Sequence, residues 1–150
     1  MSYDQGYWHT DSCAEKNLDE QYAGTHIAVY LKWCIEKGFL SKDLLMSDAD
    51  ALASVRDGRM SASEYFEKHL DWKFGEWNLN EEGNAFTKWY YSQYLEEVSV
   101  KVPSAVLGPE SNVEFPKLYV LLDDRLRQFR EFGAQEAVHK SKAKPWWKFW

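Results

Sequence analysis

The apolar residues of this chain recur at the spacing of an α-helix, and this periodicity limits the possible folds more than any other feature. The clearest apolar stripe lies in residues 18–37 and comprises Ala23, Ile27, Tyr30, Leu31 and Cys34. Such spacing predicts one helix over this segment. Gly38 follows directly and suits its C-terminal end, because glycine adopts the left-handed conformation at little cost.

Two shorter helices are expected next. Ser47 is a suitable N-cap for a helix over residues 47–56, because its hydroxyl can accept a free backbone N–H. Ser61 and Glu64 have the spacing of a capping box, in which the two side chains each satisfy one backbone N–H. This pattern predicts a third helix over residues 61–70.

A fourth helix is predicted after Asn80, which precedes two glutamates and suits an N-cap. Its aromatic face comprises Phe86, Tyr90 and Tyr94, at intervals of four residues. The helix is expected to reach about residue 98. The aromatic segment 71–80 before it predicts an ordered loop.

The segment after residue 116 allows two interpretations. Leu118, Val120 and Leu122 alternate, which would suit a short strand near 117–122. Apolar residues also recur at helical spacing, at Leu118, Leu122, Leu126 and Phe129. We favour a helix over 117–132, preceded by a long loop at 99–116. The sequence thus predicts a mainly α, single-domain bundle of about five helices with long aromatic-rich loops; the alternative is an α+β fold.

The composition agrees with one folded domain. The chain has 150 residues, of which 45% are hydrophobic and 17% aromatic, so a disordered chain is excluded. No run of about 18 apolar residues occurs, and no stable membrane insertion is expected. The N-terminus lacks the basic and apolar regions of a signal peptide, which predicts a cytoplasmic protein.

Charge divides the chain into an acidic body and a basic end. Residues 1–138 contain 14 basic and 24 acidic residues, a net charge of −10, whereas residues 139–150 contain four lysines and no acid. We therefore predict an acidic helical domain at 1–138 and a basic, Trp-rich tail at 139–150. An acidic body argues against a nucleic-acid partner, because nucleic-acid binders usually present a basic face.

The tail holds three tryptophans and one phenylalanine in its last five residues. Left free, these rings would form an exposed apolar patch, which marks a contact site or a missing docking surface. Docking on the chain's own body is the preferred interpretation. Binding of a partner and insertion into a membrane interface are the alternatives.

The common catalytic motifs are absent. The chain has no phosphate-binding glycine loop, no Gly-x-Ser-x-Gly elbow and no His-Glu-x-x-His zinc pair. An enzyme would therefore need a dispersed site, and His9, His26, Arg59 and Asp71 are the first residues to test. Their convergence in one pocket would favour this interpretation.

A metal site is not predicted from the sequence. His9 and Cys13 are four residues apart, but no further pair has a characteristic ligand spacing. His26 is expected to be a buried or half-buried histidine that hydrogen-bonds a loop carbonyl, with a ligand or interface role as the alternative. No cofactor is expected either, since no residue pattern for one was found.

Several blocks of the sequence nevertheless resemble a family of small, uncharacterised bacterial proteins. These blocks are Tyr3-Asp4 with Trp8-His9, the run from Thr25 to Trp33, Leu79-Asn80-Glu81-Glu82-Gly83-Asn84-Ala85-Phe86 with Tyr90-Tyr91, and Lys144-Pro145-Trp146-Trp147-Lys148-Phe149-Trp150. Such proteins are similar to the immunity proteins encoded beside polymorphic or contact-dependent toxins. At 123–129 the chain departs from the polar Asn-Tyr run expected there. The resemblance implies a toxin-binding function and no catalytic residues.

A binding function also agrees with the composition. Many toxin domains that act on nucleic acid are basic, so an acidic inhibitor gains association rate by electrostatic steering. The candidate acidic contacts are Glu81, Glu82, Glu96, Glu97, Asp123 and Asp124. Trp72 and Trp77 are the candidate aromatic anchors, because tryptophan often dominates binding energy. A non-enzymatic immunity protein is therefore the preferred prediction, with a small enzyme as the alternative.

Overall fold

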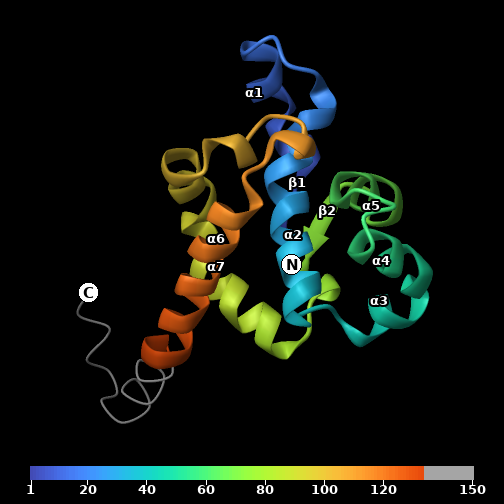
Figure 1. The fold of residues 1–150 in the computed structure, drawn as a ribbon, viewed down its shortest axis with the longest axis vertical. Helices are drawn as coiled ribbons and strands as arrows, with labels where there is room; N and C mark the ends of the chain where they lie inside the picture. The colour runs from blue at the N-terminus through green and yellow to red at the C-terminus, as the bar shows by residue number, and fades with distance from the viewer. Residues whose placement is uncertain (134–150) are drawn as a thin grey trace.

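The computed structural model describes residues 1–133, and within this range the backbone is mainly helical, as predicted (Figure 1). Its α-helices are α1 (Thr10–Glu15), α2 (Thr25–Lys37), α3 (Lys42–Ser47), α4 (Ala49–Arg56), α5 (Ala62–His69), α6 (Glu81–Lys101) and α7 (Phe115–Gln128). Two short strands, β1 (Ser2–Gln5) and β2 (Lys73–Gly75), pair antiparallel. This range contains more helices than the five predicted, because α1 was not predicted and one predicted helix is divided into α3 and α4.

Helix α2 forms the centre of the core. Ten of its 13 residues are buried, and Figure 1 shows it running between α6 and α7 on one side and α4 and α5 on the other. Gly38 ends the helix in the left-handed conformation, with φ 74°, as predicted. The start differs, because residues 20–24 form a 3-10 turn capped by Asp19 rather than the first turns of the helix.

The helix predicted over 47–56 is in fact two helices, α3 and α4. Ser41 rather than Ser47 provides the cap, since its hydroxyl accepts the Leu44 N–H at 3.2 Å. The break falls at Asp48, whose backbone is not helical and whose carboxylate accepts the Tyr65 hydroxyl at 2.7 Å. The predicted cap of the next helix is confirmed, because the Ser61 hydroxyl accepts the Glu64 N–H at 3.0 Å.

Helix α6 carries the predicted aromatic face into the core. Phe86, Tyr90 and Tyr94 are all buried. Asn80 caps the helix as predicted, with its side-chain oxygen 2.9 Å from the Gly83 nitrogen. The helix ends at Lys101, three residues beyond the predicted end.

Helix α7 confirms the helical interpretation of the segment after 116, and the alternative strand near 117–122 is wrong. Leu118, Leu122 and Leu126 are buried along one face, whereas Val120 is 71% exposed. A strand would have placed Val120 on the same face as Leu118 and Leu122. In a helix, residues four apart lie on one face, so all three leucines point toward α2 and α6. Burial therefore follows the helical period.

The strand pair was not predicted, and it joins the N-terminus to the aromatic segment 71–80. Ser2 lies opposite Gly75, and Gln5 lies opposite Lys73. Segment 71–80 is thus an ordered connection, but it contains β2 and a 3-10 turn over Glu76–Asn78. Three and four residues are too few to give a recognisable alternation.

The long loop predicted over 99–116 is shorter than expected and is hydrogen-bonded to the start of α5. The first residues of the predicted loop belong to the end of helix α6. The rest of the segment contains 3-10 turns at Pro103–Ala105 and Glu110–Asn112. The Glu110 carboxylate accepts the backbone N–H groups of Ala62 and Ser63 at 3.1 and 2.7 Å. This carboxylate therefore satisfies free N–H groups at the start of α5, where the helix dipole also favours negative charge.

Two further predictions concern the C-terminal tail and the membrane. The proposed tail at 139–150 lies outside the described residues. No helix among residues 1–133 is long and apolar enough to cross a membrane.

Candidate functional site

Four side chains from separate elements meet at the N-terminal end of the core. Asp4 comes from β1, His9 from the 3-10 turn Gly6–His9 that follows it, His26 from the first turn of α2, and Tyr91 from the middle of α6. Asp4 is the buried residue of β1 and is only 6% exposed. The pairing of β1 with β2 thus places a carboxylate inside the core, where it requires strong partners.

The Asp4 carboxylate accepts four hydrogen bonds. Oδ1 accepts from the backbone nitrogen of Gln5 at 2.9 Å and contacts His9 Nε2 at 2.7 Å. Oδ2 contacts His26 Nε2 at 3.2 Å and accepts the Tyr91 hydroxyl at 2.8 Å. A carboxylate offers about four acceptor positions, so Asp4 is fully satisfied.

The electrostatics of the cluster favour an ionised Asp4 and a neutral His26. Burial opposes ionisation of Asp4, but hydrogen bonds from His26 and His9 outweigh it and hold its pKa well below the ordinary value. Burial lowers the pKa of His26, and the hydrogen bond to Asp4 offsets this only in part. The cluster therefore contains a fixed negative charge beside a neutral imidazole at neutral pH.

One atom of this cluster has no regular partner. His26 Nδ1 is buried and makes no hydrogen bond of standard geometry among the described residues. A backbone contact with Val106 raises the His26 pKa, as a nearby acceptor does. An unpaired buried polar atom is costly, so this nitrogen requires an explanation.

His9 and His26 also contact each other edge to face, with ring centroids 4.4 Å apart. Among residues 1–133, Asp4, His9 and His26 form the group whose ligand atoms are close enough together to hold a metal ion. Both histidines were predicted as candidate site residues, whereas Asp4 and Tyr91 were not. Its prediction of no metal site relied on chain spacing, which does not apply to ligands brought together from three elements.

The four residues named for an enzyme do not converge. His9 and His26 belong to the cluster, but Arg59 pairs with Asp57 at 3.0 Å on the surface. Asp71 is exposed and lies beside Lys73. No common pocket therefore contains these four side chains.

The predicted tryptophan anchors differ in exposure. Trp77 is 55% exposed, and its ring covers Gly75. Trp72 is half-buried, because its ring packs edge to face on Tyr7 and covers Gly6 and Gly24. Trp72 thus acts mainly in packing the N-terminal segment onto the body.

Most of the predicted acidic contacts have partners within the chain. Glu82 pairs with Arg130, Asp123 with Lys37 and the Trp33 indole, and Asp124 with Arg125 and Arg127. Glu97 accepts two hydrogen bonds from Arg125, which lowers the Glu97 pKa to about 2. Glu81 and Glu96 are exposed and form no ion pair among the described residues.

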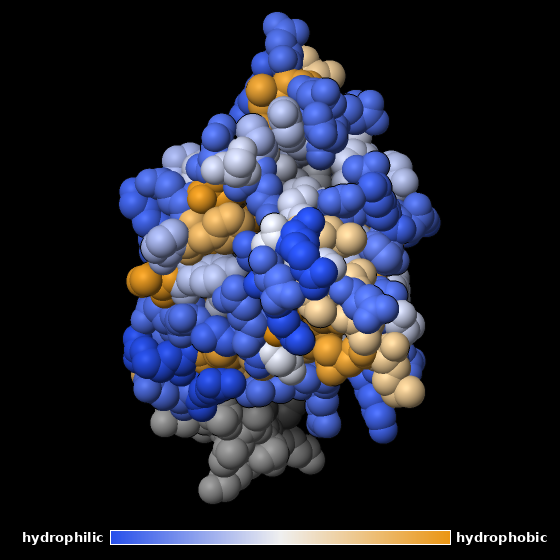
Figure 2. Space-filling view, turned by 45° about the vertical axis from the view of Figure 1, so that its right-hand side comes forward, coloured by the Kyte–Doolittle hydropathy of each residue, from blue (hydrophilic) through white to orange (hydrophobic). Residues whose placement is uncertain are grey.

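A second acidic surface was not predicted. We call residues 6–24 the N-terminal lobe; it contains α1 and lies at the upper end of the molecule in Figure 1. Tyr7 is 51% and Trp8 57% exposed on it. Its exposed carboxylates, none in an ion pair within the described range, are Asp11, Glu15, Asp19 and Glu20. In Figure 2 this upper end is largely hydrophilic, with a small apolar patch.

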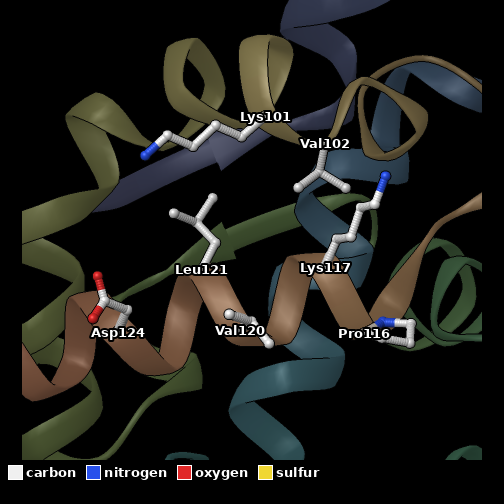
Figure 3. Close-up of a pocket in the computed structure, with 7 residues that line it drawn as sticks. All are labelled: Lys101, Val102, Pro116, Lys117, Val120, Leu121 and Asp124. Atoms are coloured by element: carbon white, nitrogen blue, oxygen red, sulfur yellow. The ribbon is translucent and has the colours of Figure 1, made fainter.

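A groove lies elsewhere, between the end of α6 and α7 (Figure 3). It has a volume of about 550 Å³ and is lined by Lys101, Val102, Pro116, Lys117, Val120, Leu121 and Asp124. Figure 3 shows Val102 and Leu121 pointing into the space between the two segments. The lining is apolar except for two lysines and one aspartate, and it lacks an arrangement for acid–base or nucleophilic catalysis.

These observations define a small, mainly helical protein with a buried histidine–aspartate cluster beneath an acidic, aromatic lobe. Residues 2–105 match the model of a family described as Domain of unknown function (DUF7832), and the chain belongs to this family. The match includes all four residues of the cluster and ends before α7. No curated protein and no solved structure matches the chain.

Proposed function

We propose that this protein acts by binding another protein, and that the partner is a basic bacterial toxin which it neutralises as an immunity protein. The observation that carries the proposal is the N-terminal lobe, where Tyr7 and Trp8 are exposed beside four carboxylates. The resemblance of the sequence to immunity proteins supports the same function.

The lobe has the chemistry of a contact surface for a basic protein. Exposed tryptophan and tyrosine are the residues that most often anchor an interface, because they bury a large area at low entropic cost. Carboxylates around them attract cationic side chains and raise the association rate. The remaining acidic surface, including Glu81 and Glu96, adds to this long-range attraction.

Co-expression tests the function directly. The reading frame adjacent to the gene is expressed in a bacterial host with and without this protein, and growth is followed. We expect the neighbour to be toxic and this chain to restore growth and co-purify with the toxin. A harmless neighbour, or toxicity that this chain does not relieve, would contradict the proposal.

Two tryptophan variants then locate the surface. Trp8→Ala is expected to weaken the complex about 30-fold or more, as loss of an anchoring residue worth about 2 kcal/mol does. Trp77→Ala is the matched control, because Trp77 is equally exposed but lies outside the lobe. If Trp77→Ala abolished protection and Trp8→Ala did not, the contact surface would be the one predicted from sequence instead.

A further inference from the structure

We propose that Asp4, His9 and His26 bind one divalent transition-metal ion of the zinc class. Their ligand atoms come from β1, the following 3-10 turn and α2, and all lie within 4.8 Å of one another. The proposal concerns the isolated chain and does not depend on the identity of any partner.

The present distances are close to those in a metal coordination sphere. Bonds of about 2.1 Å separate two ligands by about 3.0 Å at a right angle and by about 3.4 Å at the tetrahedral angle. His9 Nε2 and His26 Nε2 lie 2.7 and 3.2 Å from the two Asp4 oxygens. The ligand nitrogens of the two histidines lie within 4.8 Å of each other. Only a local approach of the two imidazole rings would therefore be needed for all three groups to coordinate one ion.

The protonation of His26 favours the metal-bound state. Without an ion, neutral His26 must carry its proton on Nε2 to bond Asp4, which leaves Nδ1 as a buried acceptor without a regular partner. With an ion on Nε2, the proton moves to Nδ1, which then becomes a donor, and a backbone contact with Val106 already favours a protonated His26 ring. Metal-bound histidines commonly donate their other N–H to a backbone carbonyl. A bound ion thus accounts for His26 Nδ1, the buried atom that hydrogen bonding alone leaves unsatisfied.

Other residues hold the three ligands in place. The Gln5 nitrogen and the Tyr91 hydroxyl fix the Asp4 carboxylate. The Tyr94 hydroxyl donates to the His26 carbonyl at 2.7 Å, which secures the first turn of α2. Such outer contacts orient metal ligands and raise affinity.

The ligand set also identifies the class of ion. Two imidazoles and one carboxylate suit zinc, cobalt, nickel and ferrous iron, whereas calcium and magnesium prefer oxygen ligands throughout. Three protein ligands leave at least one coordination position for water. The His9 side chain is 21% exposed, which gives an ion a route to the site, while His26 is only 1% exposed.

Titration of the tag-free full-length chain tests the site. Metal is removed with a chelator, Co²⁺ is added while its visible absorption is followed, and Zn²⁺ is then used to displace it. We expect binding of one ion per chain and a thermal midpoint that rises with Zn²⁺ concentration. Ca²⁺ and Mg²⁺ should not displace Co²⁺.

Histidine variants assign the binding to this cluster. His9→Gln should weaken Co²⁺ binding about 100-fold or more, since loss of a ligand costs at least as much as loss of an outer contact. His69→Gln and His139→Gln, the other two histidines of the chain, should bind as the parent does. Circular dichroism of the metal-free His9→Gln protein verifies that it is folded.

X-ray absorption spectroscopy at the zinc edge provides a second measurement, which uses the unmodified protein and does not depend on any substitution. We expect two imidazole nitrogens and one or two oxygens around the ion. Absence of saturable binding, a His9→Gln protein that binds as tightly as the parent, or a zinc environment with fewer than two imidazoles would each overturn the proposal.

Discussion

At the scale of single residues, the structure is most unusual at Asp4. A buried carboxylate is expensive, and this one is kept ionised by two histidines, a tyrosine and a backbone N–H. His26 has the opposite requirement, because burial favours its neutral form. The two residues therefore make the stability of the fold depend on pH in the same direction.

We expect the free energy of unfolding to fall as the pH is lowered from about 6.5. The His26 pKa is lowered in the folded state, so below its ordinary value of about 6.5 the unfolded chain binds a proton that the folded chain resists. Asp4, whose pKa is also lowered, adds to the loss below about pH 4. Urea unfolding between pH 7.5 and about pH 3, with chelator present, measures the effect.

The histidine contribution can be separated from the rest. His26→Gln should reduce the loss of stability between pH 6.5 and pH 5, because the group that titrates there is removed. His69→Gln, which changes an exposed histidine on α5, should keep the parent's pH dependence. An unchanged slope in His26→Gln would assign the effect to another group.

At the scale of elements, Asn80 connects the end of α2 to the start of α6. Its side-chain oxygen accepts the Gly83 N–H at 2.9 Å, and its amide donates to the Gly38 carbonyl at 2.8 Å. Its backbone nitrogen donates to the Phe39 carbonyl at 2.8 Å. One residue therefore caps α6 and satisfies a carbonyl beyond the end of α2.

We predict that Asn80→Ala lowers the free energy of unfolding by about 1–2 kcal/mol, since it removes an N-cap and a second hydrogen bond. Asn80→Asp should lose less, because its carboxylate can still accept the Gly83 N–H. Ser92→Ala is the control at an exposed position of α6, with an expected change within about 0.5 kcal/mol. Chemical denaturation measures all three. Equal stability of Asn80→Ala and Ser92→Ala would show that the cap contributes nothing.

At the scale of the whole molecule, the first nine residues, which include the start of the N-terminal lobe, hold the rest of the lobe to the body. Strand β1 pairs with β2, and Tyr3 donates to the Asn84 side chain of α6 at 2.6 Å. Asp4 links His9 to α2 and α6 through His26 and Tyr91. The lobe itself has little buried apolar surface of its own, with Cys13 and Ala23 its buried hydrophobic residues.

Removal of residues 1–9 should therefore destabilise the protein strongly and expose the lobe to exchange. We expect a large drop in the thermal midpoint and fast amide hydrogen exchange over residues 10–24, because their attachment is lost. A chain lacking only Met1 should change by about 1 kcal/mol or less, since it loses one backbone hydrogen bond to Glu76. Slow exchange over 10–24 in the longer deletion would show that the lobe is held by other contacts.

The sequence determined most of the helices and several of their ends, because these depend on neighbouring residues. The stripe in α2, the caps at Ser61 and Asn80 and the left-handed Gly38 follow from local chemistry. Local signals were ambiguous where two patterns overlapped, as at Ser47, where Ser41 is the true cap. The choice of helix over strand for α7 was correct because Leu118, Leu122 and Leu126 keep the helical period.

Only the tertiary structure decided what those elements bring together. The cluster joins residues 4, 9, 26 and 91, and this depends on a strand pair too short to give a periodic signal. The same packing pairs Glu97 and Asp124 with arginines and leaves the lobe's carboxylates exposed. Helix formation is a local free-energy balance, whereas burial, ion pairing and ligand convergence depend on contacts between residues far apart in the chain.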